Sequence, residues 1–226
     1  AEIGMRMAAI LWRYWWPRGF PADAEPRLSR LLAMPHEEHP SLARADCFRV
    51  AGVMARERGD YARARDLHQQ GLALALELNS CPDSDVVEAA QLVAMLYNAL
   101  GLDWAFEGRY KQAMPLFQEA VEAGARAGPW HTGHALSNLA WFAGHQGNYA
   151  LAQDYGQQAI AIFQTINDPA RLALAYSHLA EAALVNKDRQ TAENAARGAL
   201  RAAPPGSERF DVGSVEVLAA LAGSAG

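Results

Sequence analysis

Residues 97–120 read YNALGLDWAFEGRYKQAMPLFQEA, and this stretch decides the fold because its pattern recurs along the chain. The recurring anchor is Gly-x-Tyr. Its copies end at Tyr61, Tyr110 and Tyr149, and degenerate copies end at Pro21 and Arg189, so successive anchors are 40, 49, 39 and 40 residues apart. Three residues after every anchor stands an alanine: Ala24, Ala64, Ala113, Ala152 or Ala192. Self-similarity at such a period indicates an array of stacked repeats, in which each unit buries its apolar face only against its neighbours.

The residue sizes around the anchor predict a pair of closely packed helices in each unit. Nine residues before the anchor stands a small residue, which is Gly52, Gly101, Ala140 or Ala180. These small residues, together with the alanines after the anchor, let two antiparallel helices approach closely, and large apolar residues such as Phe48 fill the space between them. The anchor glycine supplies the backbone freedom that a tight turn needs. Each unit is therefore predicted to be a helix–turn–helix hairpin.

This pattern resembles the tetratricopeptide repeat, whose signature is aromatic-x2-Leu-Gly-x2-aromatic followed by Ala-x3-Phe. The copy at residues 97–117 matches it almost fully through Tyr97, Leu100, Gly101, Trp104, Ala113 and Phe117. The resemblance implies an all-α fold, a right-handed superhelical solenoid of antiparallel helix hairpins, here with units of about 40 residues. We expect a single solenoid over residues 1–226, with units at about 1–40, 41–80, 81–128, 129–168 and 169–206 and a partial unit at 207–226.

Two further features resemble one subgroup of that family. They are the unit length of about 40 residues, with units ending in runs such as residues 71–78, and the opening stretch at residues 11–19, which reads LWRYWWPRG. Both are similar to the C-terminal repeat region of bacterial ATP-dependent LuxR-type transcriptional regulators. This resemblance implies a sensor or scaffold domain that binds a protein or a small effector, in a fragment of a larger polypeptide. The alternative is a free-standing adaptor that binds a peptide segment of a partner protein.

Composition and motifs exclude several other functions. The net charge of −5 argues against direct nucleic-acid binding, which needs a dense basic patch. No stretch approaches the roughly 18 apolar residues of a membrane span, and the two cysteines fit reduced thiols in a cytoplasmic protein. The phosphate-binding loop, the Gly-x-Ser-x-Gly elbow and the Cys-x2-Cys and His-Glu-x2-His motifs are missing, so we expect no enzyme and no cofactor. His131 and His134 lack a third ligand nearby, so no metal site is expected.

Function in such solenoids lies on the concave face, which the first helix of each hairpin lines. Carrying the family's groove positions onto each copy through the anchor gives a predicted partner-binding set of Arg13, Arg49, Arg56, Asn98, Leu102, His134, Ser137, Trp141, His145, Ser177 and Glu181. Trp141 stands out because tryptophan with arginine and histidine neighbours is typical of binding hot spots. Its other interpretation is as filling between helices.

The C-terminal end carries one more expectation. Residues 208–222 form a lone first helix with the apolar residues Val215, Val217, Leu218 and Leu221. Solenoid ends without a polar cap tend to associate. We therefore expect self-association through this end, or fraying of it.

Overall fold

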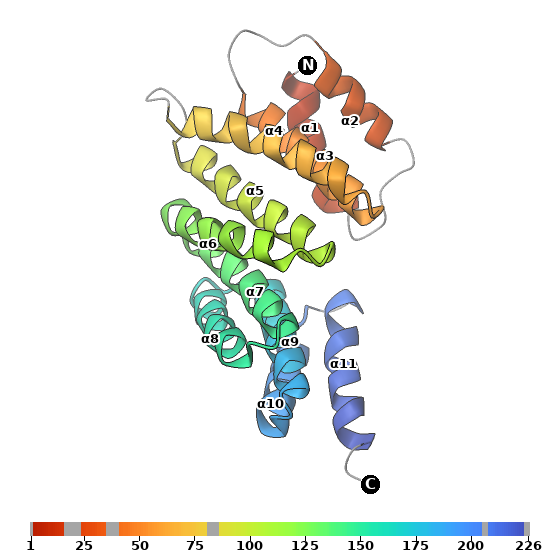
Figure 1. The fold of residues 1–226 in the computed structure, drawn as a ribbon, viewed down its shortest axis with the longest axis vertical. Helices are drawn as coiled ribbons and strands as arrows, with labels where there is room; N and C mark the ends of the chain where they lie inside the picture. The colour runs from red at the N-terminus through yellow and green to blue at the C-terminus, as the bar shows by residue number, and fades with distance from the viewer. Residues whose placement is uncertain (1, 16–23, 35–40, 81–85, 205–207, 224–226) are drawn as a thin grey trace. The chain divides into compact units, whose positions relative to one another are not determined.

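In the computed structural model the described residues are 2–15, 24–34, 41–80, 86–204 and 208–223. They form eleven α-helices and no β-strand (Figure 1), which confirms the all-α prediction. The chain divides into two compact units, residues 1–127 and residues 128–226. The single continuous solenoid stays a prediction. In the described part of the chain no helix is both long enough and apolar enough to cross a membrane.

The first unit contains six helices, which are α1 (Glu2–Trp15), α2 (Ala24–Ala33), α3 (Leu42–Glu57), α4 (Tyr61–Asn79), α5 (Val86–Phe106) and α6 (Tyr110–Ala127). The second unit contains five, which are α7 (Pro129–His145), α8 (Tyr149–Thr165), α9 (Pro169–Val185), α10 (Arg189–Ala202) and α11 (Glu208–Gly223). The pairs α3–α4, α5–α6, α7–α8 and α9–α10 pack as hairpins. Inside each unit, every first helix also contacts the next first helix, as α3 contacts α5 and α7 contacts α9.

The Gly-x-Tyr anchor builds the same turn in each described copy. Its first residue has a left-handed backbone, with φ of 80° at Gly59, 76° at Gly108, 78° at Gly147 and 62° at Lys187. Its middle residue is an N-cap in three copies, where the side chains of Asp60, Asn148 and Asp188 accept from the backbone N–H three residues ahead. Its last residue begins the second helix. The degenerate copy at Lys187 is therefore a true repeat boundary, whereas the copy at residues 19–21 lies outside the described residues.

The residue nine positions before the anchor, on the first helix, faces the residue seven positions after it, on the second helix, and their sizes are matched. A methyl group on Gly52 would overlap the ring of His68, and one on Gly101 would lie 2.9 Å from the ring of Phe117. In the second unit the small residue is Ala140, and the facing residue shrinks to Gly156. The predicted close approach of the paired helices is thus confirmed, with glycine wherever the opposite helix carries a ring.

The alanines three residues after the anchor pack where the pattern predicts. Each is at most 2% exposed: Ala24, Ala64, Ala113, Ala152 and Ala192. At the C-terminal end, α11 packs on α9 and α10 through Val217 and Leu221, while Val215 is exposed. Arg189 at the start of α10 donates a 2.7 Å hydrogen bond to the carbonyl of Leu221. Self-association through this end remains a prediction.

Candidate functional site

Four of the predicted groove residues stand twelve positions before their anchors, and all four are buried. They are Arg49, Asn98, Ser137 and Ser177, between 2% and 7% exposed. Two of them connect neighbouring first helices, because Ser137 of α7 lies 3.2 Å from His178 of α9, and Ser177 of α9 lies 2.9 Å from Ser214 of α11. In these two copies the position links neighbouring first helices, and in all four copies it presents little surface to a partner.

In the first unit, a buried ionic network occupies the space between α3, α4 and α5. Arg56 of α3 lies 3.1 Å from one carboxylate oxygen of Asp103 on α5, and His68 Nδ1 of α4 lies 2.5 Å from the other. His68 Nε2 faces the carbonyl of Arg49 at 3.1 Å. Burial lowers the pKa of His68, and its hydrogen bond with Asp103 opposes that shift. The predicted groove residue Arg56 is thus engaged inside the protein.

Three other predicted residues contribute to neither the ionic network nor the pocket of the second unit. Leu102 of α5 is half-buried. The ring of His134 lies 5.1 Å from that of Trp130, and the Trp130 ring also meets the ring of His131 edge-on at 4.9 Å. Arg13 belongs to α1, and its side chain lies outside the described residues.

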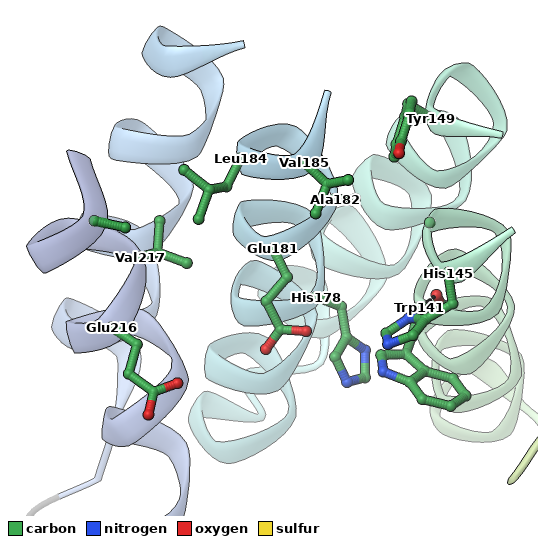
Figure 2. A pocket seen from close by; sticks show the side chains of 12 residues that line it. Trp141, His145, Tyr149, His178, Glu181, Ala182, Leu184, Val185, Glu216 and Val217 are labelled. Carbon is green, nitrogen blue, oxygen red and sulfur yellow. Dashed lines mark hydrogen bonds between the residues drawn. The ribbon is translucent and has the colours of Figure 1, made fainter. Parts of the chain in front are cut away.

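The second unit contains an open pocket between α7, α9 and α11. Its volume is about 550 Å³, and it includes three of the predicted groove residues, Trp141, His145 and Glu181. Figure 2 shows the indole of Trp141 and the ring of His145 together on α7, facing the side of the pocket where His178 projects from α9. The two α7 rings lie 4.3 Å apart. We call this space the α7–α9–α11 pocket.

Small residues keep this pocket open. Gly144 of α7 meets Ala182 of α9, since a methyl group on Gly144 would lie 3.1 Å from the Ala182 side chain. Both residues line the pocket, as does Leu184. Counted from the anchor, Gly144 and Leu184 take the place that Arg56 has in the first unit, and Ala182 takes the place of Asp103. The second unit therefore has no ion pair at these positions.

His178 is a polar lining residue that sequence reasoning missed. Its Nδ1 lies 3.0 Å from the carbonyl of Ser137, and burial lowers its pKa to about 4. The imidazole is therefore neutral at pH 7, with Nδ1–H donating to that carbonyl. Nε2 carries no proton in this tautomer, and it can accept a hydrogen bond.

The pocket also holds two carboxylates. Glu181 on α9 and Glu216 on α11 both line the pocket, and Figure 2 shows their side chains on these two neighbouring helices. Burial raises the pKa of Glu181, His145 opposes that shift, and Glu216 adds to it. Glu216 and Tyr149 were also missed, because they lie outside the first-helix positions of complete hairpins. The signal available for Glu216 was its place one residue before the buried Val217 on the final helix.

The described thiol and the clustering of possible metal ligands were the remaining chemical features of interest. Burial raises the pKa of Cys47 to about 12, and its thiol donates to the Met5 carbonyl at 3.4 Å, so it is a poor nucleophile. In the part of the chain that the structure describes, no group of three His, Cys, Asp or Glu residues could hold a metal ion. The α7–α9–α11 pocket is instead lined by aromatic, apolar and hydrogen-bonding groups, which suits noncovalent binding.

Comparison with known proteins agrees with this architecture. The sequence pattern of the family described as "Tetratricopeptide repeat" matches residues 92–165 and residues 44–84. The chain carries tetratricopeptide repeats. Proteins built from such repeats are scaffolds for protein–protein interaction and are typically not catalytic. No protein of curated function matches the chain.

Several solved structures have a fold similar to that of this chain. BtubC (BKLC) from P. vanneervenii has a TM-score of 0.65 at 17% identity, over 98% of this chain and 82% of its own. A putative kinesin light chain from Podosopora anserina with nearly identical TPR-like repeats has a TM-score of 0.61 at 18% identity, over 88% of this chain and 94% of its own. A point variant of that kinesin light chain has a TM-score of 0.63, also at 18% identity. At these identities the likeness shows the shared fold alone.

Proposed function

We propose that this tetratricopeptide repeat chain captures a segment of a partner protein in the α7–α9–α11 pocket. The observation that carries this proposal is the convergence of Trp141, His145 and Glu181, from two successive first helices, on one open pocket. A pocket of about 550 Å³ with an aromatic wall and a few polar groups has the properties of a binding site. Trp141 is half-buried, so part of its indole packs against the protein and part is available to a ligand.

We further propose that the chain is the sensing domain of a larger ATP-dependent regulator of the LuxR type. The support is the resemblance of residues 11–19 and of the 40-residue units to the repeat region of those regulators. A partner that bridges α7, α9 and α11 would stabilise the arrangement of helices to which it binds best. Its differential affinity would shift the attached switch by mass action.

Peptide display tests the binding proposal directly. A random peptide library is selected on the wild-type chain, and the selected peptides are then measured on two variants. Trp141→Ala removes the aromatic wall. Val185→Trp adds bulk at a lining residue that is 62% exposed. We expect both variants to bind the selected peptides at least tenfold more weakly.

Matched controls separate lost binding from lost folding. Val87→Trp makes the same change at a residue that is 58% exposed in the first unit, and it is expected to bind like the wild type. Circular dichroism checks that each variant is helical. Unchanged affinity in both pocket variants would remove the pocket from the function.

The regulator assignment is tested by the native gene. A nucleotide-binding domain upstream, together with a DNA-binding helix–turn–helix, would support it. An open reading frame that encodes only the repeats would favour the free-standing adaptor.

A further inference from the structure

The α7–α9–α11 pocket is lined by two carboxylates and by no permanently charged cation. Its twelve lining residues include Glu181 and Glu216 but neither lysine nor arginine. The low pKa of His178, about 4, keeps that ring neutral. Because Glu181 is partly buried and has a raised pKa, its negative charge is poorly solvated, and a positive group beside it would be favourable.

The uncharged part of the lining suits the same kind of ligand. The face of an indole attracts a cation, and Trp141 forms one wall, with Tyr149 elsewhere on the pocket surface. The Nε2 atom of His178 accepts a hydrogen bond and donates none in its neutral tautomer. Apolar residues such as Leu184 and Val217 complete the pocket, and they can pack against an aliphatic stem.

In the first unit, a carboxylate between first helices is paired with basic side chains of the protein itself. There, Asp103 is completely buried and receives both Arg56 and His68. Glu181 lies between α7 and α11 in the second unit, where the repeat position of Arg56 is filled by Gly144 and Leu184. The pocket therefore has the carboxylate and lacks the internal guanidinium.

We propose that the α7–α9–α11 pocket binds a basic side chain, arginine above all, from the partner peptide. This inference rests on the proposed function and specifies its ligand. The guanidinium pairs with the carboxylate of Glu181, Glu216 adds negative charge from the α11 side, and the aliphatic stem packs on the apolar lining, with Trp141 on the α7 side of the pocket. Arginine is favoured over lysine because its five N–H donors match two carboxylates and the Nε2 acceptor.

A set of short peptides tests this ligand chemistry. The probe is acetyl-Ala-Ala-Arg-Ala-Ala-amide, and its counterparts carry citrulline or glutamate in place of arginine. Citrulline has almost the shape of arginine without the charge. Binding to the wild-type chain is followed by NMR shifts of the Trp141 indole N–H and of pocket amides. We expect the arginine peptide to bind at least tenfold more tightly than either counterpart.

Isosteric variants locate the charge that is recognised. The double variant Glu181→Gln/Glu216→Gln keeps the shape of the pocket and is expected to lose the tenfold preference. Glu193→Gln is the matched control, because Glu193 of α10 pairs with Arg197 and does not line the pocket. This control is expected to keep the full preference.

The other outcomes overturn the inference in distinguishable ways. Equal affinity for the arginine and citrulline peptides, or tighter binding of the glutamate peptide, would refute a cationic ligand while leaving the pocket as a peptide site. Agmatine, which carries the guanidinium without a peptide backbone, would refute a peptide ligand if it bound as tightly as the arginine peptide. If no probe shifted the pocket resonances, the inference would fail, and peptides selected by display would decide separately whether the chain binds partners there.

Discussion

Arg56 in the first unit and Gly144 in the second occupy the same place in the repeat, five residues before the last residue of the anchor. Arg56 reaches across to Asp103 on the next first helix, and His68 lies behind that carboxylate. Gly144 instead meets Ala182, the residue that replaces Asp103 in the second unit. One unit fills the space between neighbouring first helices with a satisfied ionic network, and the other leaves it open as a pocket.

The difference shows that the repeat pattern fixes the backbone and leaves the space between repeats adjustable. Turn, small-residue contacts and buried alanines are shared by both units, so the helices pack alike. What lies between first helices depends on a few side chains. Buried charges there need partners from the protein itself, whereas a partly exposed carboxylate beside an open pocket can take its partner from a ligand.

The largest effect on stability is expected in the buried ionic network of the first unit. Asp103→Ala leaves Arg56 without its buried partner and removes the hydrogen bond to His68, so we expect a loss of about 3 to 5 kcal/mol in the free energy of unfolding of this unit. Hydrogen exchange of α3 and α5 amides measures it. Asp154→Ala is the control, because Asp154 bonds to Gln158 on the surface of α8. A loss below about 1 kcal/mol for Asp103→Ala would show that the network does not hold the unit together.

Acid should destabilise the second unit through His178. The unfolded chain takes up this proton near pH 6.5, and the folded chain takes it up only near pH 4. The stability is therefore complete above about pH 6.5 and is lost as the pH falls toward 4, by about 3 kcal/mol. His145 and Arg171 also disfavour the charged ring. Because His178→Gln removes the titrating imidazole, this variant should flatten the pH dependence of stability measured at the α7 and α9 amides. If stability fell equally steeply with pH in the wild type and the variant, His178 would not be the group responsible.

Replacing glycine by alanine should change the free energy of unfolding in opposite directions at Gly101 of the first unit, which lies nine residues before its anchor, and at Gly156 of the second unit, which lies seven residues after its anchor. Gly101→Ala places a methyl group 2.9 Å from the Phe117 ring, and we expect a loss of about 1 to 3 kcal/mol through overpacking. Gly156→Ala meets no atom closer than 3.6 Å and replaces glycine inside a helix, so it should stabilise by about 0.5 to 1 kcal/mol. Thermal unfolding of both variants makes the comparison. The same sign in both would mean that the matched sizes do not set the helix spacing.

The smallest effect concerns the degenerate turn. Lys187 has a left-handed backbone that glycine adopts in the other described anchors, so Lys187→Gly should stabilise by about 1 kcal/mol. Gly147→Lys, the reverse change at the preceding anchor, should destabilise by a similar amount. If neither variant changed the melting temperature, the two turns would not be equivalent.

Much of the fold was predictable because the residues of the anchor are those that a tight turn between two helices requires. Glycine before the turn, a capping residue and small residues at fixed offsets follow from backbone sterics and close helix contact, which the sequence displays directly. The turn at Lys187 was predictable for the same reason, since the spacing of the pattern continued where its residues did not.

The candidate site was predictable only in part, because it depends on what the neighbouring helix contributes. The anchor register brought Trp141, His145 and Glu181 to one pocket, although whether they bind a partner stays a prediction. The same register also selected Arg49 and Ser177, whose side chains are buried. His178 was missed, because its place in the pocket follows from the small residues Gly144 and Ala182 beside it.

The most direct test of the account is a map of where a selected peptide binds. The wild-type chain is labelled with nitrogen-15, and its amide shifts are followed as a display-selected peptide is added. The account predicts that the perturbed residues cluster on α7, α9 and α11, around Trp141, His178 and Glu181, while Arg56 and Asp103 in the first unit are unchanged. Perturbations centred on α3 and α5 instead would contradict it, because they would place the partner on the unit whose first-helix space is already filled.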